Sequence, residues 1–318
     1  MTGLRWIAVA AVLAAVPAAA QEYPAKAVRI ITSTPGNFHD IVARHMARLL
    51  AERWRQPVVV ENRGGAGATL AATATAQAPA DGYTLLISDR TGLAVSPTLM
   101  RNLAYDPFRD LAPVSLVAAA PMILAAHSSV PAADMRQFVG YLRASAQTNL
   151  GSAGPATGPH LAGEVLKQVT GANVVNVHYK GTPAAMTGLL GGEVQAGFML
   201  VPVVLPHINA GKVKAYAITG KKRFAGAPGI PTMTELGMAE LESELWLALM
   251  APARTPELII ARVNRDVVEI LKSAAMRDAL LALGAEPMHS TPDELAAYMR
   301  SETARWRKVI EVAGIRLD

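Results

Sequence analysis

The sequence predicts an α/β protein with two lobes, each built on a mainly parallel sheet flanked by helices. Short β-branched runs alternate with amphipathic stretches in the first third of the chain, and a second series follows the apolar segment 113–127. Apolar strands that alternate with helices are typical of buried parallel sheets joined by right-handed crossovers.

In the first series, strands are expected at 28–32, 57–61 and 83–88. A turn with glycine or proline and then a stretch of helical periodicity follow each of them. The helix after the first strand has an apolar stripe of Val42, Met46, Leu49 and Leu50, which indicates one face packed against the sheet.

In the second series, strands are expected at 150–154, 172–179, 194–198 and 213–219. A further strand at 244–252 leads into two helices whose starts are marked by Thr255-Pro256 and Thr291-Pro292, with a capping hydroxyl before a proline. Gly284 marks the expected end of the first of these helices. The predicted boundaries place 21–122 and 228–318 in the first lobe, and 123–227 in the second.

The first twenty residues have the pattern of a cleavable secretory signal. Arg5 precedes an apolar run from Trp6 to Val16, and Ala18-Ala19-Ala20 forms a small-residue cleavage pattern. The run is too short to span a bilayer. We therefore expect a periplasmic protein that begins near Gln21.

Composition excludes several classes of function. There is no cysteine, which excludes a disulfide framework and a thiolate metal site. The chain has a formal charge of +5; loss of Arg5 with the signal leaves 5 − 1 = +4. This charge is spread along the chain without a stripe that would follow a nucleic acid backbone. We expect a monomer with no metal and no cofactor.

Glycine-containing strand–loop–helix junctions recur, at 32–40, 61–67, 88–92, 151–164 and 178–186. A helix start leaves backbone N–H groups unpaired and carries partial positive charge, worth about 0.3–1 kcal/mol to an anion. Several such ends that converge from two lobes can hold a small organic acid. Any one loop is equally compatible with an ordinary turn between strand and helix.

Nucleotide binding and catalysis are not favoured. Gly65-Ala66-Gly67 lacks the third glycine of the dinucleotide pattern, and no Gly-Lys-Ser/Thr phosphate loop is present. There is no Gly-x-Ser-x-Gly elbow, and His39 and His45 are too far apart on a helix to share a face. We do not expect an enzyme; a secreted hydrolase or lyase is the least favoured alternative.

Many ordered segments resemble one family. They include "QPVVVENRGGAGATLAA" (56–72), "PADGYTLLIS" (79–88), "YDPFRDLAPVSLV" (105–117), "VHYKGTPAAM" (177–186) and "LPHINAGKVKAYAIT" (205–219). With these, the chain resembles the Bug-type solute-binding receptors of tripartite tricarboxylate transporters. The resemblance implies a type II periplasmic binding protein with venus-flytrap closure, which captures a small carboxylate and delivers it to a membrane permease. Presentation of the closed state to a membrane sensor is the alternative.

The resemblance also implies a set of ligand-binding residues. The loop after the first strand supplies Thr34, Gly36, Asn37, Phe38, His39 and Asp40, and the loop after the third strand supplies Ser88, Asp89, Arg90 and Thr91. The second lobe supplies Ser152, Ala153, Gly154, Thr157, His160, Tyr179, Lys180, Gly181 and Met199.

Several of these residues depart from the family pattern. Phe38 and His39 are bulkier than the small residues of the family, and Asp89-Arg90 replaces small hydroxyl residues. Arg90 can pair with a carboxylate, while Phe38 and Met199 can cover an apolar body, which suggests an aromatic or bulky acid. Alternatively, Arg90 pairs with Asp89 or faces solvent, Phe38 fills the ligand space, and His39 caps the helix.

Overall fold

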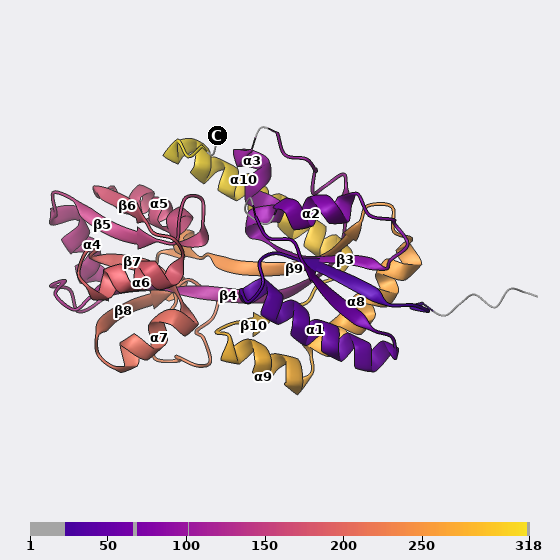
Figure 1. Cartoon of the computed structure of the whole chain (residues 1–318). Coiled ribbons are helices and arrows are strands. Elements are labelled where there is room, and N and C mark those ends of the chain that lie inside the picture. The colour runs from indigo at the N-terminus through magenta and orange to yellow at the C-terminus, as the bar shows by residue number, and fades with distance from the viewer. Residues whose placement is uncertain (1–22, 66–68, 101, 317–318) are drawn as a thin grey trace, which may run out of the picture.

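The protein forms two α/β lobes that lie side by side (Figure 1). The computed structural model describes residues 23–65, 69–100 and 102–316. The expected signal at 1–20 and residues 66–67 of the glycine-containing junction 61–67 lie outside these ranges. Within the described ranges, no helix is both long enough and apolar enough to cross a bilayer.

The first lobe has a sheet with helices on both faces. Its strand order is β2-β1-β3-β9-β4, and the parallel strands β1, β2 and β3 come first. The strands are β1 (Val28–Thr32), β2 (Val58–Asn62), β3 (Thr84–Asp89), β9 (Glu244–Pro252), β10 (Glu286–Pro287) and part of β4 (Leu111–His127). One face packs on α1 (Phe38–Trp54), α8 (Glu257–Leu271) and α9 (Ala274–Ala282). The other packs on α2 (Thr69–Ala76), η2 (Thr91–Val95) and α10 (Pro292–Ala313), with α3 (Ser96–Leu99) following η2.

The second lobe repeats this layered arrangement. Its strands are β5 (Thr148–Ser152), β6 (Val174–His178), β7 (Ala196–Leu200), β8 (Val213–Ile218) and the end of β4, with β5 parallel to β6 and β7. One face packs on α4 (Met135–Ala144) and α5 (Gly158–Thr170), and the other on α6 (Thr182–Leu190) and α7 (Val201–Asn209). The turns η3 (Thr234–Leu236) and η4 (Ala239–Leu241) complete it. The predicted two-lobe α/β class is confirmed.

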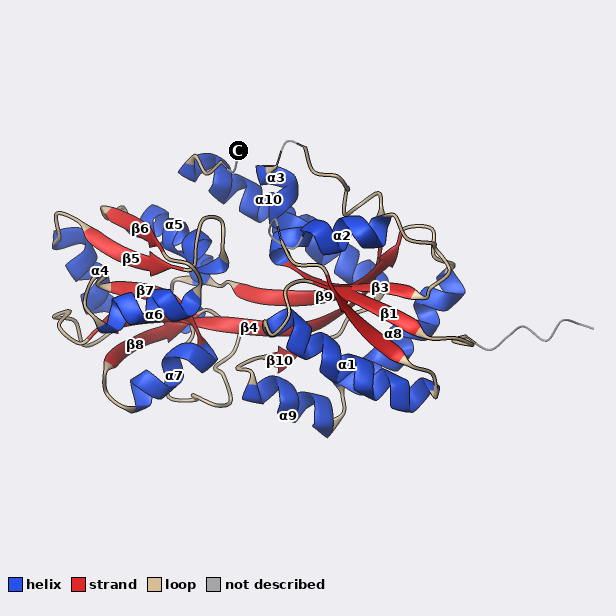
Figure 2. Ribbon diagram, in the orientation of Figure 1, coloured by secondary structure: helices blue, strands red, loops and turns tan. Residues whose placement is uncertain are grey.

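Two long strands join the lobes (Figure 2). Strand β4 pairs with β9 as far as Pro121, and from Met122 onward it pairs with β7 and β8 of the second lobe. The chain returns at Glu244, the first residue of β9. Residues 228–243, which the sequence places in the first lobe, pack on the second, because Met233 and Leu241 are buried in its core.

The helix starts agree with the sequence in part. Thr291 forms the expected cap of α10, with a reciprocal bond between its backbone and the side chain of Glu294. The helix expected to end at Gly284 is instead divided: α8 ends at Leu271, and Ser273 caps a separate helix α9 by accepting from the Met276 N–H. Gly284 follows α9, where its φ of +68° suits glycine.

Candidate functional site

The carboxyl ends of the parallel strands of the two lobes meet at one junction. Arg90, directly after β3, approaches Gly158 at the start of α5 so closely that a Cβ on Gly158 would lie 2.8 Å from its guanidinium. Ligands of open α/β sheets bind at the carboxyl ends of strands. The loops after β1 and β3 in the first lobe and after β5 and β6 in the second lobe all follow such strand ends.

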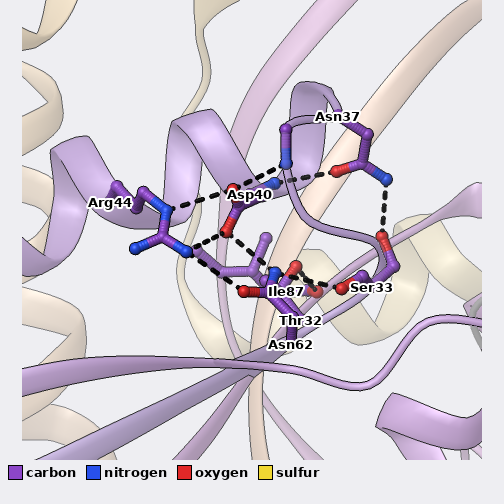
Figure 3. A network of polar contacts seen from close by, with 8 residues as sticks. Thr32, Ser33, Asn37, Asp40, Arg44, Asn62 and Ile87 are labelled. Carbon is purple, nitrogen blue, oxygen red and sulfur yellow. Dashed lines mark hydrogen bonds and ion pairs between the residues drawn. The ribbon is translucent and has the colours of Figure 1, made fainter.

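A polar network fixes the loop after β1 (Figure 3). Asp40 is buried, and its carboxylate accepts from the Gly36 N–H at 2.8 Å, from Asn62 Nδ2 at 2.8 Å and from Arg44 Nε at 3.0 Å. Burial alone would raise the pKa of Asp40, but these hydrogen bonds and the charge of Arg44 lower it below its usual value. Asn37 caps α1 by accepting from the Asp40 N–H at 3.0 Å.

The same network limits what this loop can offer a ligand. The side chains of Asn37 and Asp40 are engaged within the protein, so they hold the loop in place. Gly36 has a φ of +75°, which requires glycine, whereas the Thr34 side chain is exposed. A Cβ on Gly64 would lie 2.7 Å from Thr34 Oγ1. The described part of the junction 61–67 therefore packs directly against the loop after β1.

His39 and Asp89 form a buried pair at the end of β3. His39 Nε2 lies 3.3 Å from Asp89 Oδ2, and the side chains are 12% and 8% exposed. The Gly92 N–H donates to Asp89 Oδ1 at 3.1 Å. Burial acts to raise the pKa of Asp89, but His39, the Gly92 N–H and Thr91 outweigh it and lower the pKa. Asp89 is thus a carboxylate at neutral pH.

Arg90 is fully buried and joins several parts of the chain. Its Nη1 donates to Ser243 Oγ at 2.9 Å and to the Glu244 carbonyl at 3.3 Å, and the guanidinium stacks 4.4 Å from the ring centroid of Trp306. Burial lowers the pKa of Arg90, while the nearby Glu302 and Asp89 act to raise it. The alternative in which Arg90 faces solvent is wrong, since the residue is 1% exposed.

Several polar atoms of residues at the end of β3 and the start of α1 have no hydrogen-bond partner in the described part of the chain. They are Ser88 Oγ, both ring nitrogens of His39 and Arg90 Nε, and all of them are buried. A buried polar atom without a partner costs about 1–3 kcal/mol. Ser88 pairs with Ala248 and Asp89 with Leu247, so Ser88 and the His39–Asp89 pair lie on opposite faces of the sheet.

In the second lobe, Ser152 at the end of β5, His178 at the end of β6 and His160 in the first turn of α5 lie together. Ser152 Oγ lies 2.7 Å from His178 Nδ1, and the rings of His178 and His160 meet edge to face with centroids 4.6 Å apart. His160 Nδ1 accepts from the Ala156 N–H at 2.8 Å. Burial, followed by the charge of His160, lowers the pKa of His178.

The remaining expected residues of this lobe shape its loops. The Ala153 carbonyl accepts from the Gly181 N–H at 3.2 Å, and Thr157 Oγ1 donates to the Gly154 carbonyl at 2.7 Å. Tyr179 donates to Glu193 at 2.9 Å, which directs its hydroxyl into a bond within the lobe. The Lys180 side chain is exposed.

The proposed cover for an apolar ligand is not supported at Met199. Met199 is 1% exposed and lies in the core beneath α6 and α7, because its strand β7 sits in the middle of the sheet. Phe38 is half-buried and packs on the core of the first lobe. Only Phe38 of the two therefore retains exposed surface.

The residues that the sequence analysis missed act by holding others. Asn62 and Arg44 fix Asp40, and Ser243 and Trp306 hold Arg90. Asn62 could have been noticed as a polar residue at the carboxyl end of its strand, whereas nothing local to Trp306 reveals its partner. No group of three or more possible metal ligands occurs among the residues that the structure describes.

Comparison with known proteins identifies the family. The family described as "Tripartite tricarboxylate transporter family receptor" matches residues 42–315. The chain belongs to this receptor family. Protein BugT of Bordetella pertussis is 38% identical over 311 residues, which are 95% of this chain and 94% of that protein.

Solved structures of similar proteins support the same conclusion. "Structure of a periplasmic transporter" is 34% identical, with a TM-score of 0.78 over 93% of this chain and 100% of that one. "R. palustris Rpa4515 with adipate" is 31% identical, with a TM-score of 0.78 over 93% and 99%. MatC from Rhodopseudomonas palustris "with bound malate" is 31% identical, with a TM-score of 0.73 over 91% and 100%. The receptor family and these neighbours are solute-binding proteins and not enzymes, as the sequence analysis expected.

Proposed function

We propose that this protein captures a small organic acid at the junction of its lobes in the periplasm and delivers it to a membrane permease. The observation that carries the proposal is Arg90, whose buried Nε has no hydrogen-bond partner among the described residues and whose guanidinium reaches Gly158 at the start of α5 in the second lobe. Binding of adipate and malate by similar receptors supports an acid as the ligand.

Each lobe has a role in this proposal. In the first lobe, the hydroxyl of Ser88 and the Nε–H of Arg90 are free to donate hydrogen bonds to a carboxylate. In the second, the start of α5 carries partial positive charge, and its cap residue Thr157 makes no side-chain bond to the helix. Contacts from both lobes favour the arrangement in which the lobes are closed on the ligand.

The test is a thermal-shift screen of the purified protein against di- and tricarboxylates, acidic amino acids and aromatic acids, followed by calorimetry. A ligand at about 100 times its dissociation constant adds ~2.7 kcal/mol, which raises the melting temperature by a few degrees. Absence of any shift across these acids would contradict the proposal.

A matched pair of variants locates the site. Ser88→Ala and Thr148→Val each remove a buried hydroxyl that has no partner among the described residues, so both should fold with unchanged or raised stability. Thr148 begins β5, at the end of the strand opposite the junction. We expect Ser88→Ala to weaken ligand binding about tenfold and Thr148→Val to leave it unchanged. Equal affinities of the two variants would place the ligand elsewhere.

Delivery is tested in cells. Uptake of the identified acid should fall to the background rate when the receptor gene is deleted, and should return when the gene is restored. Unchanged uptake in the deletion strain would contradict the delivery part of the proposal and leave acid capture standing.

A further inference from the structure

Helix α9 of the first lobe has one leucine that contacts the second lobe. Met276 and Leu280 of this helix are buried in the first-lobe core. Leu281, the next residue, instead packs on a cluster formed by the second lobe, which includes Val201 and Val204 of α7. The two lobes therefore share an apolar contact in addition to the strands β4 and β9 that cross between them.

The backbones of the two lobes also approach each other at this contact. A Cβ on Gly284, which follows α9, would lie 2.5 Å from Cδ of Pro202 and 3.1 Å from Cβ of Val201, at the start of α7. A cavity of about 200 Å³ lies nearby, and its lining includes Phe224 of the second lobe and Met288 of the first. We call the packing of Leu281 and Gly284 on the start of α7 the rear contact.

The rear contact lies on the far side of the crossing strands from the candidate site. Strands β8 and β10 both pair with β4 and lie off the path of strands that leads from β1 and β3 to β5 and β6. Figure 2 shows α7, α9, β8 and β10 below β4, whereas β3, β5 and β6 lie above it. A rotation about β4 and β9 that brings the loops after β3 and β5 together thus separates α7 from α9.

We propose that the rear contact opposes closure of the lobes, so that Leu281 sets how tightly the protein holds its ligand without touching that ligand. A ligand shifts the lobes toward closure only through its higher affinity for the closed state, and its apparent affinity is reduced by the fraction of molecules that are open. Weakening the rear contact removes part of this opposition. The effect on affinity rests on the proposed function, whereas the effect on the lobes does not.

The distance between the lobes can be measured without a ligand. The chain has no cysteine, so Arg48→Cys on α1 and Thr187→Cys on α6 provide two exposed positions for dyes, one in each lobe. These helices follow the loops after β1 and β6, and their distance falls when the lobes close around the candidate site. Single-molecule energy transfer between the dyes gives the ratio of closed to open molecules.

Two leucines at the end of α9 provide a matched pair of variants. Leu281 and Leu283 are both half-buried, but Leu281 packs on the second-lobe cluster and Leu283 on the first-lobe core. We expect Leu281→Ala to raise the ratio of closed to open molecules about fivefold, which is the effect of losing a half-buried leucine contact. Leu283→Ala should leave the ratio at the wild-type value. Leu281→Val, a smaller truncation, serves if Leu281→Ala does not fold.

Affinity provides the second measurement. By calorimetry, Leu281→Ala should bind the acid found in the thermal-shift screen about fivefold more tightly than wild type does, with Leu283→Ala unchanged. An unchanged or lower ratio of closed molecules in Leu281→Ala, or an equal rise in Leu283→Ala, would overturn the proposal. If the screen finds no acid, the proposed function fails and the measurement without ligand still decides the role of the rear contact.

Discussion

Replacing Glu244 with glutamine should stabilise the protein at neutral pH and reduce the dependence of its stability on pH. Glu244 is the first residue of β9, where the chain returns to the first lobe, and no residue described in the structure bonds its carboxylate. Burial raises the pKa of Glu244 to about 7 from 4.5. Among its neighbours, Lys221 lowers the pKa, while Glu242, Glu286 and Glu302 raise it.

The raised pKa of Glu244 makes the stability of the protein depend on pH, with a definite sign and size. The folded state retains a proton on Glu244 that the unfolded state releases above pH 4.5, so its stabilising effect is lost as pH rises toward 7. The difference of about 7 − 4.5 = 2.5 units, at about 1.4 kcal/mol per unit, corresponds to roughly 3 kcal/mol between pH 4.5 and neutral pH. Glutamine keeps the shape and cannot ionise, so it avoids this loss.

Urea unfolding at pH 5, 6, 7 and 8 measures the effect. The gain of Glu244→Gln over wild type should be small near pH 5 and reach about 1–3 kcal/mol at pH 8. Glu240→Gln is the control, since Glu240 is exposed on the preceding turn and its variant should follow the wild-type curve. Parallel curves for wild type and Glu244→Gln would refute the reasoning.

Three further predictions concern the scaffold. Asp266→Ala should lower the free energy of unfolding in urea by about 3–5 kcal/mol. The reason is that the buried carboxylate of Asp266 accepts from Trp54 Nε1 at 2.8 Å and from two arginines. A decrease below about 1 kcal/mol would contradict this prediction. Gly197→Ala should lower the melting temperature by an amount equivalent to about 1–3 kcal/mol, because its Cβ would lie 2.7 Å from the Gly151 carbonyl oxygen. Gly140 lies in α4, and a Cβ added to it would have no atom within 4 Å, so Gly140→Ala should instead stabilise the protein by about 0.5–1 kcal/mol. Equal melting temperatures of the two variants would show that the close approach to the Gly151 carbonyl does not affect stability.

The sequence predicts the strands and helices within each lobe better than the segments that connect the two lobes. Strands and helices that pack within one lobe have a clear period, as in α1, where Val42, Met46 and Leu50 are all buried. Residues 228–243 have no such period, and their position depends on where Met233 and Leu241 find apolar partners. Periodicity also cannot show that β4 serves two sheets, because a strand buried on both faces is apolar along its whole length.

The candidate site could be predicted only to the level of its loops. The turns after β1, β3 and β5 follow from glycine and capping residues, which act locally. Whether a side chain in such a turn is free depends on distant partners: Asp40 is engaged by Asn62 of the next strand, and Arg90 by Trp306 near the other end of the chain. Residue type alone makes Asp40 and Arg90 equally good candidates, and only the fold separates them.

The position of Arg90 explains why a ligand at this site would act on both lobes. Arg90 contacts Ser243 and the Glu244 carbonyl at the return crossing, and its guanidinium lies between Trp306 of α10 and Gly158 of α5. A ligand bonded to its Nε therefore fixes a side chain that already holds the point where the lobes join. Because a ligand shifts a conformational equilibrium only through its different affinity for the two states, contacts to Arg90 and α5 together favour closure, whereas contacts to the loop after β1 alone do not.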